Sequence, residues 1–269
     1  MNRFEHDSLS FHYVETGHGM PFVFQHGLGG DVSQPFGLFT PPDGIRMLAF
    51  DCRGHGRTRP LGDEAKVGIA AFADDLAAFL DHVGADEVVV GGISMGAAVT
   101  LNFALRFADR LKGLVQSRPA WLAEPNRDNA RRFSLITRFI RECGPVEGKQ
   151  RFQDTDEYRN TEKESPDAAN SLLGQFDYVH AEETAVKLER IPNDQPCASL
   201  DELRTIRVPT LVLANRQDPV HPFAFAKTIV SYIPDCEFHE LTPKSVSVDQ
   251  HAEDVQKFLG NFLTRRFLR

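Results

Sequence analysis

A serine between glycines, in the segment GISMG at 92–96, is the part of the sequence best suited to chemistry. It follows three valines at 88–90 and precedes a helix-like run at 97–107. A sharp turn between a strand and a helix lifts such a serine above the edge of a sheet. Glycines are needed beside it, because side chains there would collide with the neighbouring strand and helix. The sequence therefore predicts that Ser94 is a nucleophile.

A serine hydroxyl is a weak nucleophile at neutral pH, so we expect a base and a carboxylate that orients it. In this architecture the carboxylate and then the histidine follow the serine along the chain. Asp218 fits the carboxylate because it follows an apolar run at 210–214, whose C-terminal end should face the site. Asp235 and Asp249 are alternatives, but Asp235 precedes its strand and Asp249 lies only two residues from His251.

His251 fits the base, since it follows the last apolar run and precedes a helix-like segment at 252–262. The chain has 10 histidines, and His239 and His221 are the rival candidates. His239 lies inside an expected strand, whereas His221 opens a helix beside Asp218. The predicted triad therefore takes His251 as its base.

A glycine-rich loop, QHGLGG at 25–30, follows another apolar run and offers backbone amides to the serine. The N–H groups of Leu28 and Met95 are predicted to form the oxyanion hole. His26 is expected to make structural hydrogen bonds, because a second base would compete for the serine. The polar turn DCRGHG at 51–56 is also interpreted as structural.

The elements that must position these residues follow from apolar runs at 21–27, 45–51, 87–92, 113–117, 209–215 and 236–241. Continuous apolar runs without alternation are typical of buried parallel strands. Helical patterns lie between them, as at 69–83, where apolar residues recur at spacings of three and four. The sequence therefore predicts an α/β fold, with a mostly parallel sheet covered by helices on both faces.

The region 119–205 interrupts this alternation. It has no convincing strand and shows helical patterns at 129–143, 150–158, 166–176 and 181–190. So long a segment is more than a plain loop, and we expect a helical cap. Because predicted site residues come from both sides of it, 1–118 and 206–269 should fold as one core.

Composition excludes several classes of function. The chain has 269 residues, of which 41% are hydrophobic and 25% are charged, an ordinary globular composition. Its formal net charge of −8 gives no general electrostatic reason to bind nucleic acid or an anionic membrane. The N-terminal segment lacks the apolar core of a secretory signal. The uncharged stretch at 88–105 contains glycines, so a strand, a turn and a helix fit it better than a membrane span.

The cysteines show no spacing typical of a metal or dithiol site; they are Cys52, Cys143, Cys197 and Cys236. Reduced thiols in a cytoplasmic protein are the simplest interpretation. No metal or cofactor is expected, and a homo-oligomer stays an open alternative.

Five segments, in this order, carry a resemblance to a known family: HGLGG, DCRGHG, GISMG, NRQDPVHP and DQHAEDV. The sequence resembles the α/β-hydrolase fold family over nearly the whole chain outside the insertion. This resemblance implies a sheet of about eight strands, a cap between the sixth and seventh strands, and the triad Ser94, Asp218 and His251. The most similar subgroups are esterase and enol-lactonase-like members, along with cofactor-free haloperoxidase relatives.

A serine nucleophile argues against the family's haloalkane dehalogenases and epoxide hydrolases, which use an aspartate at this position. We expect hydrolysis of a carboxylic ester or lactone of a small molecule through an acyl-enzyme on Ser94. A carbon–carbon bond hydrolase and a cofactor-free haloperoxidase or perhydrolase are alternatives. A slow-turnover small-molecule receptor with the same fold is the alternative of another class.

Arg118 and Trp121 are the candidates for substrate binding, because they follow the run at 113–117, which should end beside Ser94. Arg118 could meet a substrate carboxylate, and the only tryptophan could line the acyl pocket. The alternative is that Arg118 pairs with an acid of the cap and Trp121 packs the base of the cap.

Overall fold

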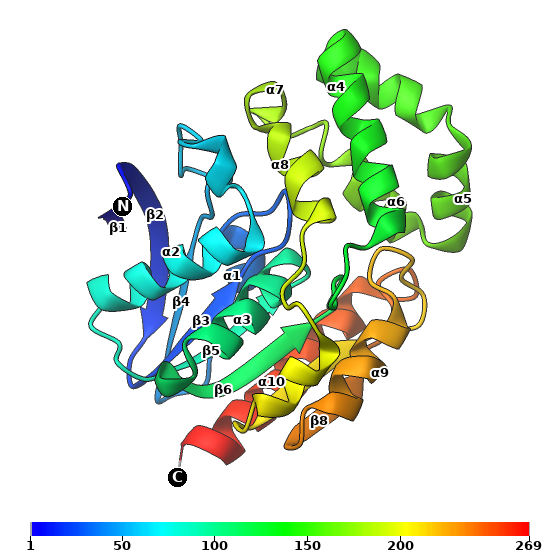
Figure 1. Ribbon diagram of the computed structural model, residues 1–269. Helices are drawn as coiled ribbons and strands as arrows, with labels where there is room; N and C mark the ends of the chain where they lie inside the picture. Colours follow the sequence, from blue (N-terminus) through cyan, green and yellow to red (C-terminus); the bar gives the residue numbers. More distant parts are fainter. Residues whose placement is uncertain (1, 269) are drawn as a thin grey trace.

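The structure, a computed structural model that describes residues 2–268, contains one eight-stranded sheet with helices on both faces (Figure 1). The strands are β1 (Asn2–His6), β2 (Leu9–Gly17), β3 (Met20–Gln25), β4 (Ile45–Phe50), β5 (Val88–Ile93), β6 (Leu111–Ser117), β7 (Thr210–Ala214) and β8 (Cys236–Glu240). Their order across the sheet is β1-β2-β4-β3-β5-β6-β7-β8. Strand β2 pairs antiparallel with β1 and β4, and the other neighbours are parallel. The predicted α/β fold with a mostly parallel sheet is confirmed.

Helices of the core bury an apolar cluster against each face of the sheet. On one face lie α2 (Ile69–His82), α3 (Met95–Arg106) and α9 (Phe223–Tyr232). On the other lie α1 (Ser33–Leu38) and α10 (Val248–Phe267). The remaining short turns of the core are the 3₁₀ helices η1 (Glu64–Lys66) and η2 (Ala108–Arg110). Such two-sided burial explains why the parallel strands are continuous apolar runs in the sequence.

Helix α2 illustrates how the sequence pattern forms its element. Its apolar residues Ile69, Phe72, Leu76 and Phe79 recur at spacings of three and four and are fully buried. One stripe of the helix therefore faces the sheet, while the acidic residues between them include the exposed Asp74. The helix predicted at 69–83 is confirmed to within one residue.

The segment between β6 and β7 is helical within residues 2–268 and lies beyond the C-terminal ends of the parallel strands (Figure 1). Its helices are α4 (Arg127–Gln153), α5 (Asp156–Glu164), α6 (Pro166–Leu173), α7 (Ala181–Thr184) and α8 (Val186–Arg190), followed by the 3₁₀ turns η3 (Ile191–Asn193) and η4 (Leu200–Thr205). Helices α4 to α8 share an apolar cluster of their own, which includes Phe133 and Phe152. We call 119–205 the cap, with the predicted boundaries.

Helix α4 joins two segments that the sequence separates. The predicted break after residue 143 corresponds to a kink, where Gly144 has φ 75° and Pro145 follows. Proline cannot donate a helical hydrogen bond, and glycine adopts a positive φ at little cost. The helix therefore changes direction here instead of ending.

The uncharged stretch at 88–105 forms β5 and most of α3, as predicted. Within residues 2–268, no helix combines the length and apolar character needed to cross a membrane.

Candidate active site

Ser94 stands between β5 and α3 in a strained backbone conformation, with φ 55° and ψ −109°. Residues other than glycine rarely adopt a positive φ, and such strain clusters at functional sites. The glycines on either side have a steric cause. A Cβ on Gly92 would lie 2.0 Å from the carbonyl carbon of Gly96, and one on Gly96 would lie 2.3 Å from the oxygen of Gln25. Only glycines let strand and helix approach closely enough to present Ser94 at this turn.

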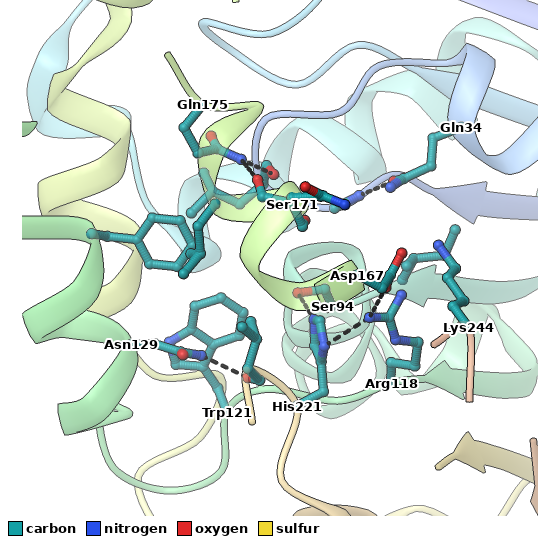
Figure 2. Close-up of a pocket in the computed structure, with 17 residues that line it drawn as sticks. Gln34, Ser94, Arg118, Trp121, Asn129, Asp167, Ser171, Gln175, His221 and Lys244 are labelled. Carbon is teal, nitrogen blue, oxygen red and sulfur yellow. Dashed lines mark hydrogen bonds and ion pairs between the residues drawn. The ribbon is translucent and has the colours of Figure 1, made fainter. Parts of the chain in front are cut away.

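Ser94, His221 and Asp218 form a chain of hydrogen bonds, and Figure 2 labels the first two of these residues. The Oγ of Ser94 lies 2.8 Å from Nε2 of His221, and Nδ1 of the same ring lies 2.9 Å from Oδ1 of Asp218. Because a carboxylate only accepts, Nδ1 carries the proton and Nε2 is free to accept from the serine. The four atoms of this chain thus have the arrangement that a nucleophile, a base and an orienting acid require.

The structure brings the predicted Ser94 and Asp218 together, but it does not bring His251 to them. The ring of His251 donates from Nδ1 to the backbone oxygen of Thr242, at 2.8 Å. Within residues 2–268 no hydrogen bond joins His251 to Ser94 or Asp218. The assignment of the base is therefore corrected from His251 to His221, because the ring of His251 ties the loop after β8 to the start of α10.

A single turn of chain sets the positions of both the acid and the base. The backbone N–H of His221 donates to Oδ1 of Asp218 at 3.2 Å and approaches the backbone oxygen of Asp218 at 3.3 Å. In such a turn the side chains at i and i+3 lie on the same side. Sequence reasoning passed over His221 because it stood beside Asp218. The signal that could have found it is this spacing directly after a strand.

Two side chains of the cap bind the backbone of this turn by hydrogen bonds. Nδ2 of Asn129 donates to the backbone oxygen of Val220 at 2.8 Å, and Nη1 of Arg132 donates to that of Pro219 at 3.0 Å. Both side chains are buried, and both belong to α4. The two residues between the acid and the base are therefore fixed by the cap.

Arg118 approaches the acid from the end of β6. Its Nε and Nη2 lie 2.8 and 2.7 Å from Oδ2 of Asp218, and its Nη2 lies 3.2 Å from Nδ1 of His221. The cap residue Asp167 is more distant, at 4.0 Å from Nη2. The main partner of Arg118 is thus Asp218, a carboxylate of the core, and not the cap acid Asp167. Its Nε is bound to Asp218 and is not free to bind a substrate.

The charges around the site shift the pKa values of the acid and the base. Burial alone would raise the pKa of Asp218, but His221 and Arg118 lower it well below its ordinary value through their charges and hydrogen bonds. Burial lowers the pKa of His221, and the charge of Arg118 adds to this against the opposing effect of Asp218. The acid is therefore held ionised, and the base is held neutral at neutral pH.

The predicted oxyanion hole lies beside the serine. Leu28 forms part of the cavity wall next to Ser94. Met95 is the first residue of α3, where backbone N–H groups have no acceptor within the helix. His26 shapes the loop: its Nδ1 donates to the oxygen of Gly27 at 2.9 Å and its Nε2 accepts from the N–H of Cys52 at 3.1 Å. Both ring nitrogens face the backbone, as expected of a structural histidine.

A cavity of about 330 Å³ opens above Ser94, between the core and the cap. Its wall includes the predicted substrate-binding residues Arg118 and Trp121, together with many polar side chains, among them Gln34, Asn170, Ser171, Gln175 and Lys244 (Figure 2). Trp121 is 2% exposed, belongs to the apolar cluster that includes residues of α2, α3 and α9, and also lines the cavity. Sequence reasoning missed Lys244, which lies in the loop after β8, where the base was expected.

Comparison with known proteins places this geometry in a family. A family model described as alpha/beta hydrolase fold matches residues 20–245. The AB hydrolase superfamily protein YisY of Bacillus subtilis is 27% identical over 242 residues, which cover 81% of this chain and 85% of that protein.

Two solved structures share the fold over almost the whole chain. The enol-lactonase from Burkholderia xenovorans LB400 has a TM-score of 0.75 at 22% identity, covering 98% of this chain and 100% of the other. A thermophilic esterase from Thermogutta terrifontis has a TM-score of 0.71 at 23% identity, covering 97% and 99%. The chain belongs to the α/β-hydrolase fold family.

Proposed function

We propose that this protein is a serine hydrolase that cleaves a carboxylic ester or lactone of a small molecule through an acyl-enzyme on Ser94. The observation that carries this proposal is the ring of His221, which is hydrogen-bonded to Ser94 on one side and to Asp218 on the other. Membership of a hydrolase family and the cavity above the serine support it.

In the first half of the reaction, Nε2 of His221 takes the proton of Ser94 while Oγ attacks the acyl carbon. Asp218 holds the ring in the required tautomer and stabilises its cation. The amides of Leu28 and Met95 donate to the oxyanion. His221 then gives its proton to the departing alkoxide, which leaves the acyl group on Ser94.

In the second half, a water molecule takes the place of the alcohol. His221 removes one of its protons as the oxygen attacks the acyl carbon, and a second oxyanion forms in the same hole. Its collapse returns the proton to Ser94 and releases the carboxylic acid. The catalytic residues are thus Ser94, His221 and Asp218.

Arg118 serves this reaction as a positioning residue. Its two contacts with Oδ2 hold the carboxylate of Asp218 so that Oδ1 faces the ring of His221. Its charge also favours the ionised acid and the neutral base. Arg118, which follows β6, therefore fixes the carboxylate of Asp218, while the cap residues Asn129 and Arg132 fix the backbone between Asp218 and His221.

Replacement of the nucleophile tests the proposal most directly. With short p-nitrophenyl esters, Ser94→Ala should lower kcat/KM by about 10⁴-fold or more, because the acyl-enzyme cannot form. A thermal melt and a far-UV circular dichroism spectrum like those of the wild type would show an intact fold. Retained turnover in Ser94→Ala would overturn the mechanism.

The same assay distinguishes the competing functions. Steady turnover after a burst of one equivalent of p-nitrophenol supports a hydrolase with an acyl-enzyme. A single acylation without turnover would favour a receptor. A lactone and a vinylogous diketone acid, compared with the ester, separate ester chemistry from cleavage of a carbon–carbon bond.

A further inference from the structure

Within residues 2–268 the ammonium of Lys244 makes no hydrogen bond, and two buried atoms of the cavity wall lack a partner: Nε1 of Trp121 and Oε1 of Gln175. The Nε1 of Trp121 is buried without a partner, although a buried indole N–H usually finds an acceptor. Lys244 also lacks an ion pair within the same residues. Two of these three unpaired groups are donors and one of the donors is a cation, so the cavity suits a ligand that brings acceptor oxygens to them.

Lys244 is a partly buried cation on the side of the catalytic serine where Arg118 lies (Figure 2). Burial lowers the pKa of Lys244, and the charge of Arg118 acts in the same direction, whereas Asp167 and Asp218 oppose it. A charge that is removed from water without a direct partner is unfavourable. An anion bound in the cavity would compensate for this lost hydration.

The nearby carboxylates do not meet that need. Asp218 is engaged by His221 and by Nε and Nη2 of Arg118. The side chain of Asp167 is 31% exposed, and the ion pair that it forms is with Arg118, at 4.0 Å. Within residues 2–268, Lys244 is therefore a cation of the cavity wall that has no hydrogen bond or ion pair of its own, whereas Arg118 is engaged by Asp218.

We propose that the substrate is an ester or lactone that also carries a carboxylate, and that Lys244 binds this carboxylate. The inference rests on the proposed hydrolase function and names the substrate class of the same site. A charge-assisted hydrogen bond is short and strong compared with a neutral one, and it has most effect where water is partly excluded. Lys244, in the loop after β8, thereby selects the substrate, while Asp218 and His221, in the turn after β7, assist the attack by Ser94.

The test compares isosteric esters that differ only in charge. Monomethyl succinate and methyl succinamate place a carboxylate or a neutral amide on the acyl side, and acetoxyacetate and acetoxyacetamide do so on the alcohol side. For at least one pair, the wild type should prefer the carboxylate by about tenfold or more in kcat/KM, chiefly through KM. The pair that shows the preference also reveals which side of the ester faces Lys244.

Variants of the lysine assign the preference to its charge. Lys244→Met should abolish the preference, measured as the ratio of kcat/KM within each pair, and Lys244→Arg should retain it. The matched control is Lys227→Met, which removes an exposed lysine of α9 outside the cavity wall and should behave as the wild type. Equal rates for both members of each pair, or an unchanged preference in Lys244→Met, would overturn the inference.

The single tryptophan provides a second readout that needs no turnover. Because Trp121 lines the cavity, its fluorescence in Ser94→Ala should report binding of the intact esters, tighter for the carboxylate in a manner that requires Lys244. Hydrolysis that depends on Ser94 but shows no carboxylate preference would refute the substrate class alone. Binding that depends on Lys244 without any hydrolysis would refute the hydrolase alone. Tighter binding of an ammonium-bearing ester, which Asp167 would favour, would also contradict the proposal.

Discussion

Two neighbouring loops, after β7 and after β8, differ in what they bring to the cavity. The turn at 215–222 carries both Asp218 and His221, and these two side chains form a hydrogen bond with each other. The loop at 241–247 carries Lys244 instead. The helix that follows it contains His251, whose ring binds back to Thr242. The turn after β7 thus holds Asp218 and His221 together, whereas the loop after β8 carries a cation and is bound by the ring of His251 from the start of α10.

The difference shows how an acid and a base can be positioned without two separate loops. In the turn after β7, the backbone N–H of His221 already bonds to the carboxylate of Asp218. The distance between the side chains of Asp218 and His221 therefore depends on local backbone geometry. Hydrogen bonds from the cap and from Arg118 support this geometry. In the proposed mechanism the loop after β8 supplies no catalytic group, so its side chains are available to bind the substrate.

The same substitution at His221 and at His251 gives the largest expected difference in activity. His221→Asn should lower kcat by about 10³-fold or more, because the base and the acid of both steps are lost. His251→Asn should leave kcat within about threefold of the wild type, since this ring takes no part in proton transfer. Ester hydrolysis at pH 8 measures both. The reverse pattern, with His251→Asn inactive and His221→Asn active, would return the base to the loop after β8.

The pH profile examines the role of Arg118 beside the turn. Since His221 must be neutral, kcat/KM of the wild type should rise with pH through an apparent pKa below the ordinary value of about 6.5. Arg118→Met removes a cation that opposes protonation of the ring, so this limb should move to higher pH. The plateau should fall about 10- to 100-fold as Asp218 loses its support.

A conservative variant separates charge from position. Arg118→Lys keeps the cation but cannot make both contacts of the guanidinium with Oδ2. Its acid limb should therefore stay near that of the wild type even where its plateau falls. An acid limb in Arg118→Met that coincides with the wild-type limb would show that Arg118 does not influence the base.

The sequence predicted those elements whose signal is local. Parallel strands covered on both faces are continuous apolar runs, so β3 to β8 were found close to their observed bounds. The strands β1 and β2 were missed, because they alternate or are partly exposed. The turn between them contains Asp7 and Ser8 at φ 50° and 62°, without the glycine that usually signals such a turn.

The same distinction applies to the site. Ser94 could be located because its turn imposes glycines on its immediate neighbours. The choice of base could not be settled, since chain order alone permits either His221 or His251, and the decision depends on where the last two loops lie in space. Arg118 was singled out for its position after β6, but its contact with Asp218 joins residues 100 positions apart, which no local pattern encodes.

The smallest expected effect is on stability, and it tests what His251, near the start of α10, does for the loop after β8. His251→Phe keeps a ring in a site that is 1% exposed but removes the donor to Thr242. It should lower the free energy of unfolding by about 1 kcal/mol at pH 8, measured by urea denaturation. An unchanged stability would contradict a structural role for this ring.

The difference in the free energy of unfolding between the wild type and His251→Phe should depend on pH. Burial lowers the pKa of His251 in the folded protein, so the ring takes up a proton at a lower pH there than in the unfolded chain, where it does so near pH 6.5. Acidification through this value therefore costs the wild type stability that His251→Phe cannot lose at this position. Groups common to both proteins cancel in the comparison. The difference in stability between the two proteins should narrow from pH 8 to pH 5.5, because proton uptake at residue 251 favours the unfolded state of the wild type alone.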